Sequence, residues 1–229
     1  MVVRAVILDF GGTLADGHIN WDEYHTAIQG LLKGLGFRIG ISRLKKAIAA
    51  ALERLQKVRA REQELTLEEV YAYALSKLGI PAEEETLRMI HSLFRSHFKT
   101  TLYPCVEEIL SELSKRYKLA MLSNTMSDTP RITLQQTRLI RYFDIAVCSR
   151  DLGIRKPNPR MFQFVLEELG VEPEEAVHVG DSVDEDMEGA SRARIRAIWI
   201  KGPEASSWTG LTIGSICELP EFLAKLDGS

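Results

Sequence analysis

The chain has 229 residues, of which 45% are hydrophobic and 27% are charged, and its formal net charge at pH 7 is −3. This composition excludes a disordered chain, a collagen-like repeat and a small disulfide-rich scaffold, and it supplies enough apolar side chains for one substantial core. The balanced charge provides no overall basic field that would attract nucleic acid.

Cysteine usage and apolar runs indicate the compartment. The three cysteines, Cys105, Cys148 and Cys217, are widely spaced and form no CxxC pair, which favours a reduced, cytoplasmic protein. The opening apolar run stops at Asp9, and no later run approaches the ~18 residues of a membrane span. Asparagine and glutamine together number nine against 18 arginines, a bias found in thermophiles that also arises by ordinary variation.

The first predicted strand, Val2–Asp9, is an almost continuous apolar run, typical of a strand covered on both faces. Between Asp16 and about Lys99 helical periodicity replaces the strand pattern. Capping-box patterns begin helices at Asn20 and Thr66. Four amphipathic helices in one block, lying between the first strand and the second, predict an inserted helical cap.

From residue 104 onward, short apolar runs alternate with stretches of helical period, as in βαβ units. The predicted strands of this part are Lys118–Ser123, Ile145–Cys148, Ala176–Gly180, Arg196–Ile200 and a weaker Leu211–Ile213. The predicted helices are Cys105–Arg116, Pro159–Leu169, Asp184–Arg194 and Leu219–Leu226.

Together these elements predict an α/β protein. The expected architecture is a doubly wound, Rossmann-like parallel sheet core, residues 1–15 and 100–229, with an inserted all-helical cap domain, residues 16–99. Ligands of open α/β sheets bind at the carboxyl ends of the strands, so the polar residues at those ends are the candidates for chemistry.

Two of these segments follow the first and second predicted strands of the core. Asp9 is followed by Gly11, Gly12 and a threonine; the carboxylate can attack as a nucleophile or bind a metal, and the glycines let backbone N–H groups face an anion. Ser123 and Asn124 end the next strand and can donate hydrogen bonds to a phosphoryl oxygen. Taken separately, each segment also fits an ordinary strand-end turn.

Two further segments supply charge. Lys156 precedes a proline on a stiff, extended stretch that suits a fixed cation, although a solvated surface lysine fits the same pattern. Gly180 leads into a helix start that carries Asp181 and Asp186 among four acidic residues. Clustered carboxylates favour a hard divalent ion such as Mg²⁺, or interact favourably with a helix N-terminus. The histidines, His178 among them, form no metal-ligand spacing.

In their order and spacing the four segments resemble the haloacid dehalogenase-like (HAD) hydrolase superfamily. Its pattern is a strand ending in DxDGT, a strand ending in Ser or Thr, a lysine often followed by proline, and GDxxxxD leading to Gly-Ala. The helical insert lies where the C1-type cap of that family lies, so the resemblance covers essentially the whole chain. It implies a hydrolase acting on a small phosphorylated metabolite.

The resemblance also implies a role for each residue. Asp9 would be the nucleophile that becomes a transient aspartyl phosphate. Mg²⁺ would be held by Asp9, the backbone carbonyl of Gly11 and Asp181, with Asp186 in support. The phosphoryl group would be bound by Ser123, the backbone of Asn124 and Lys156, and Lys156 would also pair with the nucleophile.

One position departs from the family pattern. Gly11 stands where the phosphatases of the family have a second Asp, which protonates the leaving alcohol. General acid–base catalysis is worth about 10²–10⁴ in rate, so a slow phosphatase is expected unless Asp16, His18 or a cap residue brought in by closure substitutes. The alternatives are a dehalogenase, a phosphonatase-like hydrolase with a Schiff base on Lys45 or Lys46, and a weakly active or inactive binding module.

Overall fold

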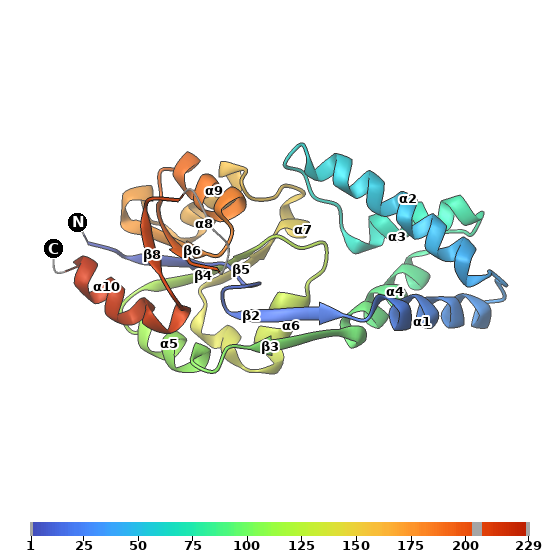
Figure 1. Cartoon of the computed structure of the whole chain (residues 1–229), viewed down its shortest axis with the longest axis horizontal. Helices are drawn as coiled ribbons and strands as arrows, with labels where there is room; N and C mark the ends of the chain where they lie inside the picture. Colours follow the sequence, from blue (N-terminus) through green and yellow to red (C-terminus); the bar gives the residue numbers. More distant parts are fainter. Residues whose placement is uncertain (1, 203–207, 228–229) are drawn as a thin grey trace. The chain divides into compact units, whose positions relative to one another are not determined.

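The computed structural model describes residues 2–202 and 208–227. Two compact units divide the chain, one comprising Met1–Asp16 and Thr101–Ser229, the other Gly17–Thr100. The first unit is organised by a six-stranded sheet in the order β5-β4-β1-β6-β7-β8 (Figure 1). The strands are β1 (Ala5–Leu8), β4 (Lys118–Ser123), β5 (Ile145–Cys148), β6 (Ala176–Gly180), β7 (Arg196–Ile200) and β8 (Leu211–Ile213).

Every pairing in this sheet is parallel. β1 lies in the middle, where Leu8 is opposite Met121 of β4 and Val179 of β6. The register therefore brings the carboxyl ends of β1, β4 and β6 to one edge of the sheet.

Helices cover both faces of the sheet (Figure 1). Alternate residues of β1 enter different cores: Val6 and Leu8 pack with α5 (Val106–Leu113) and α10 (Leu219–Asp227), whereas Ala5 and Ile7 pack with α8 (Pro159–Leu169). All four side chains are fully buried. This two-sided burial explains the continuous apolar run, and it confirms the predicted doubly wound α/β fold.

The remaining helices of this unit are α6 (Thr129–Gln136), α7 (Ser149–Leu152) and α9 (Glu188–Arg192). The helix predicted at Asp184–Arg194 is in fact split, because a π-type turn at Val183–Met187 precedes α9. Ser182 accepts a hydrogen bond from the backbone of Glu185 at the start of this turn. The wide turn places Asp186 in the interior, where it is 1% exposed.

The second unit contains the four predicted helices, α1 (Trp21–Gly34), α2 (Ile41–Arg59), α3 (Leu67–Leu78) and α4 (Glu84–His97). Asn20 caps α1 by accepting from two backbone N–H groups. Thr66 and Glu69 form the predicted reciprocal capping box of α3. That helix ends at Gly79, whose φ of 72° is the left-handed conformation that favours glycine.

The prediction of an all-helical insert misses a two-stranded sheet formed by β2 (Ala15–Ile19) and β3 (Phe98–Leu102). The chain passes between the two units within these strands. Their sequences, ADGHI and FKTTL, are largely polar and much of each strand is exposed. They therefore lack the apolar pattern by which the strands of the main sheet are recognised.

The prediction of reduced cysteines is wrong for one pair, because Cys105 and Cys217 form a disulfide in the structure. These residues are 112 positions apart, and nothing local in the sequence reports that α5 and α10 pack together. Cys148 is free and buried. No helix among the described residues has the length and apolarity needed to cross a lipid bilayer.

Candidate active site

A buried lysine joins the segments that the sequence separates. The Lys156 ammonium donates to Asp9 Oδ1 at 2.6 Å, to Asp186 Oδ1 at 2.6 Å and to the backbone carbonyl of Leu122 at 2.9 Å. Its three protons are thus all used, and the side chain is 1% exposed. Burial acts against the charged form of Lys156, but Asp186 and Asp9 outweigh it and raise its pKa. Lys156 is therefore a fixed cation, not a solvated surface lysine.

The two carboxylates that share this lysine differ electrostatically. Burial raises the pKa of Asp9 to about 7; Lys156 opposes the shift, and repulsion from Asp186 adds to it. Burial disfavours ionisation of Asp186 too, but hydrogen bonds and charge from Lys156 and His178 hold its pKa below the usual range. The surroundings therefore favour the charged form of Asp186 and disfavour that of Asp9.

Three carboxylates form an oxygen-rich cluster that fits a divalent cation. One oxygen each from Asp9, Asp181 and Asp186 can be chosen so that all lie within 4.8 Å of one another. Oxygen donors are the ligands that Mg²⁺ prefers. The fit depends on Gly12, whose Cβ, if it had one, would lie 2.1 Å from Asp181 Oδ2. Glycine at this position lets the loop after β1 approach the loop after β6.

The Asn124 side chain is hydrogen-bonded to the loop that carries Lys156. Its side-chain oxygen accepts from the Lys156 backbone N–H at 2.9 Å, and its amide donates to the Lys156 carbonyl at 2.9 Å and to Glu185 Oε2 at 2.8 Å. Glu185 is also paired with Arg155. The side-chain oxygen of Asn124 and both of its amide protons are thus engaged within the protein. The neighbouring Ser123 is 5% exposed at the end of β4.

The structure adds His178 to this set. Its ring is fully buried, with Nε2 2.9 Å from Asp186 Oδ1 and Nδ1 3.0 Å from the backbone carbonyl of Ile7. Metal-ligand spacing does not detect such a residue. The signal in the sequence is a polar side chain in an otherwise apolar strand, two residues before Gly180.

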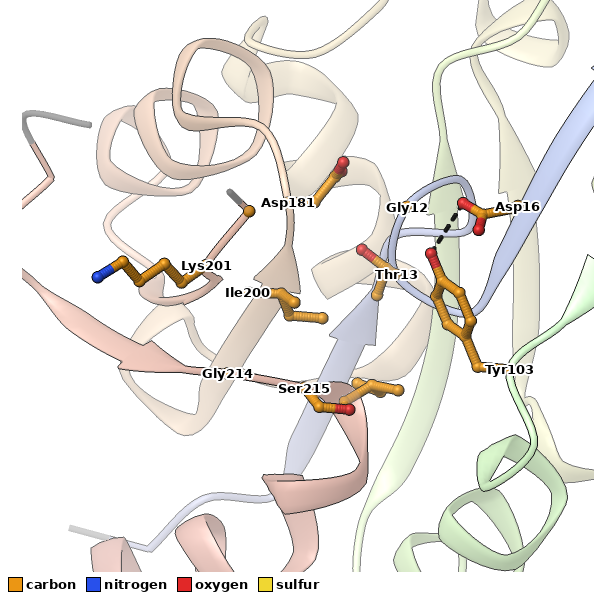
Figure 2. A pocket seen from close by; sticks show the side chains of 11 residues that line it. Gly12, Thr13, Asp16, Tyr103, Asp181, Ile200, Lys201, Gly214 and Ser215 are labelled. Atoms are coloured by element: carbon orange, nitrogen blue, oxygen red, sulfur yellow. Dashed lines mark hydrogen bonds between the residues drawn. The ribbon is translucent and has the colours of Figure 1, made fainter. Parts of the chain in front are cut away.

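A cavity of about 360 Å³ opens beside Asp181 (Figure 2). Asp16 and Tyr103 lie on one wall, where the Tyr103 hydroxyl donates to Asp16 Oδ1 at 2.8 Å. Burial and this contact raise the pKa of Tyr103 to about 12. The Thr13 hydroxyl lines the cavity and is buried, with no hydrogen-bond partner within the described part of the chain. The opposite wall comes from the segments around Lys201 and Ser215.

Two other candidates for proton transfer or covalent chemistry lie in β2 and α2. His18 is an exposed residue of β2. Lys45 in α2 is exposed and forms an ion pair with Asp22 at 2.6 Å. Both residues belong to the second unit.

The sequence of this chain is similar to those of known hydrolases. The family model described as haloacid dehalogenase-like hydrolase matches residues 3–194. Phosphoserine phosphatase of Thermus thermophilus is 36% identical over 165 residues, covering 69% of this chain and 64% of that protein. Phosphoglycolate phosphatase of Aquifex aeolicus is 34% identical over 173 residues, covering 67% and 78%. (S)-2-haloacid dehalogenase 4A of Burkholderia cepacia is 29% identical over 239 residues, covering 97% and 96%.

Several of these likenesses extend over only part of the relative. The chain spans between 54% and 64% of the length of three curated relatives. A solved 2-haloacid dehalogenase from Pseudomonas syringae has a TM-score of 0.69 at 24% identity, covering 98% of this chain and 100% of that one, which shows a shared fold. Since the family model covers most of the sequence, the chain belongs to the haloacid dehalogenase-like hydrolase family.

Proposed function

We propose that this protein is a Mg²⁺-dependent phosphatase that hydrolyses a small phosphate monoester through an aspartyl-phosphate intermediate. The observation that carries the proposal is the buried contact between Asp9 and Lys156, with Asp181 close enough to share a cation with Asp9. The likeness to curated phosphoserine and phosphoglycolate phosphatases supports a phosphorylated substrate.

The reaction has two steps in this site. In the first, a carboxylate oxygen of Asp9 forms a bond to phosphorus while the bond between phosphorus and the leaving oxygen breaks; the leaving oxygen takes its proton from solvent water, because Gly11 supplies none. In the second, a water oxygen forms a bond to phosphorus while the bond between phosphorus and the Asp9 oxygen breaks; the proton of the attacking water passes to solvent, and phosphate and the Asp9 carboxylate are released. The Lys156 ammonium offsets the negative charge that gathers around phosphorus. Ser123 and the backbone N–H of Asn124 orient the phosphoryl oxygens.

Asp9, the Gly11 carbonyl and Asp181 would hold Mg²⁺, and Asp186 would support the site. When bound, the ion supplies charge neutralisation for the carboxylates and the phosphoryl group. The donor set fits because two of the three carboxylates belong to loops that glycine allows to approach closely.

Gly11 makes the protonation of the leaving alcohol the weak step. A glycine offers no proton, and general acid help is worth about 10²–10⁴ in rate. A good leaving group such as p-nitrophenolate needs that help least. The proposed enzyme is therefore slow on alkyl phosphates and faster on aryl phosphates.

The test is hydrolysis of p-nitrophenyl phosphate. We expect turnover with Mg²⁺, none with EDTA, and none for Asp9→Asn, which keeps the shape of the side chain but removes its charge. Incubation of the wild-type protein with substrate, followed by an acid quench, should trap phosphate on Asp9, identified by mass spectrometry. Equal turnover in EDTA, or full activity of Asp9→Asn, would refute the proposal.

A dehalogenase is the second candidate, because the likeness to (S)-2-haloacid dehalogenase 4A extends over 97% of the chain. Such an enzyme would release chloride from 2-chloropropionate without added metal. The phosphonatase-like alternative requires a Schiff base on Lys45 or Lys46, and a borohydride-reducible adduct with phosphonoacetaldehyde would favour it. Retained binding of Mg²⁺ and phosphate without turnover of any substrate would favour a binding module.

A further inference from the structure

We propose that His178 is a positioning residue that acts through Asp186: it holds the Lys156 ammonium in place against Asp9. The activity readouts below rest on the phosphatase function proposed above, but the central readout does not. His178 is not among the residues to which the family resemblance assigns a role.

The imidazole connects the sheet to the acidic loop. His178 is in register with Ile7 of β1, and its Nδ1 lies 3.0 Å from the Ile7 carbonyl. Its Nε2 lies 2.9 Å from Asp186 Oδ1. Both facing oxygens are acceptors, so the single N–H of a neutral imidazole can donate to only one of them, and the negative charge of Asp186 favours the proton on Nε2. The ring of Phe162 packs against the imidazole at nearly a right angle, with centroids 4.9 Å apart, and limits its rotation.

Asp186 needs such a support because it lies on a short irregular turn. Its Oδ2 accepts from the Ser182 N–H at 3.0 Å, a contact from within its own loop. Its Oδ1 accepts from both Lys156 and His178. Of these donors, only His178 belongs to a strand in the middle of the sheet. The imidazole therefore ties the direction of the Asp186 carboxylate to a buried strand in the middle of the sheet.

The position of the Asp186 carboxylate determines that of the ammonium. Lys156 has three acceptors, and Asp186 supplies one of the two charged ones. If the Asp186 carboxylate turned away, the ammonium would retain hydrogen bonds only to Asp9 and to the Leu122 carbonyl. The ammonium and the Asp9 carboxylate could then shift together. With Asp186 fixed, Lys156 is held from two sides and Asp9 has one orientation relative to it.

Packing alone does not require a histidine here. The other residues of β6 are Ala176, Val177, Val179 and Gly180, and all are buried without a polar side chain. A buried imidazole costs desolvation unless both nitrogens are satisfied, and an aliphatic residue would avoid that cost. The polar function of His178 is therefore the contact to Asp186 that an aliphatic residue lacks.

The experiment compares His178→Gln with His178→Asn. In place of histidine, the Gln amide can reach the Nε2 position and donate to Asp186, whereas the shorter Asn amide reaches only the Nδ1 position next to Ile7. The central readout is the rate at which acetic anhydride acylates Lys156 in the metal-free protein, followed by peptide mass spectrometry. This rate needs no substrate and no turnover. The acylation rate of Lys156 should rise about 10-fold in His178→Asn and about 2-fold at most in His178→Gln. Loss of a supporting hydrogen bond around a site has effects of this size.

Activity provides the second readout. Supporting contacts of this kind are worth about 10–100-fold, so kcat for p-nitrophenyl phosphate should fall by that factor in His178→Asn, with KM nearly unchanged and with substantial recovery in His178→Gln. His91→Asn is the matched control, because His91 is also buried and contacts the carboxylate of Glu68, but it lies in the other unit. It should change neither readout.

The outcomes separate the two proposals. If the wild-type protein hydrolyses no phosphate ester, the function proposal fails, and the acylation rates still decide the role of His178. Equal acylation of Lys156 in the wild-type, Gln and Asn proteins, each folded by circular dichroism, would overturn the positioning role. Equal effects of Gln and Asn on both readouts would also overturn it, since they would indicate a structural role of the ring alone.

Discussion

The Lys156 ammonium offers the sharpest test at the level of a single residue. Replacing it in Lys156→Met leaves Asp9 and Asp186 buried without their cation, and breaking a buried ion pair in this way costs about 3–5 kcal/mol. Without Lys156 the pKa of Asp9, already raised to about 7 by burial, rises further. Lowering the pH from 8 to 5 then protonates Asp9 in the folded variant and relieves the repulsion.

We therefore expect Lys156→Met to lose about 3 kcal/mol of stability at pH 8 and clearly less at pH 5, relative to wild type at each pH. Urea unfolding at the two pH values measures the difference. A loss that is constant with pH would show that the carboxylates are not left charged and unpaired.

Gly11 and Gly12 are adjacent, but they should respond to substitution in opposite ways. A Cβ at Gly11 meets no atom within 4 Å, and the backbone there is not left-handed. Gly11→Asp should thus fold normally and raise kcat on alkyl phosphates by about 10-fold or more, with a smaller gain on p-nitrophenyl phosphate. Paired rate measurements on the two substrates check this.

Gly12→Ala is the control. Gly12 has a φ of 70°, and a Cβ there would collide with the Asp181 carboxylate at 2.1 Å. This variant should lose Mg²⁺ affinity and activity together. Unchanged kinetics of Gly11→Asp on alkyl phosphates would mean that another residue already supplies the proton, or that phosphate esters are not the substrate.

The raised pKa of Asp9 leads us to expect that Mg²⁺ binding depends on pH. Protons and Mg²⁺ compete for the same carboxylate, and its pKa in the metal-free protein is about 7. Affinity for Mg²⁺ should then be about 10-fold weaker at pH 6 than at pH 8. Calorimetric titration at the two pH values measures it, and Asp9→Asn should bind weakly at both. Equal affinity at the two pH values would exclude Asp9 as a ligand.

At the scale of secondary-structure elements, a disulfide links the start of α5 to the start of α10. Cys105 precedes α5 and Cys217 precedes α10, and the bridge closes a loop of 112 residues. The chain-entropy relation for such a loop gives up to about 4–5 kcal/mol of stabilisation. The double variant Cys105→Ser with Cys217→Ser should lower the melting temperature, and a reductant should then have no further effect. Cys148→Ser is the matched control, because reductant should still lower its melting temperature.

The β2–β3 pair shows which strands the apolar pattern of the sequence does not reveal. β1, β4 and β6 are recognised from their apolar runs because both of their faces are buried. β2 and β3 carry few apolar residues, and their pairing depends on two segments about 80 residues apart along the chain meeting in space. No local property of either segment reports that meeting.

At the scale of the whole molecule, the sheet topology assembles the candidate site. β1 lies between β4 and β6, so residues far apart in sequence emerge at one edge. The chain is similar in sequence both to curated phosphatases and to a dehalogenase that matches almost its full length. Likeness to relatives therefore does not choose the reaction. Under the proposed function, the choice rests with the side chains at this edge, above all the carboxylates Asp181 and Asp186 and the absence of a side chain at Gly11.

The α/β class, most strands and helices, and the residues at strand ends could all be predicted from the amino-acid sequence. These features depend on apolar period, capping and glycine placement, which are properties of neighbouring residues. The polar groups that meet are known from the folded chain alone: the contact between His178 and Asp186, the hydrogen bonds between Asn124 and the Lys156 backbone, and the disulfide. Those contacts depend on strand register and crossover connections, which bring distant segments within 3 Å and leave no local trace in the chain.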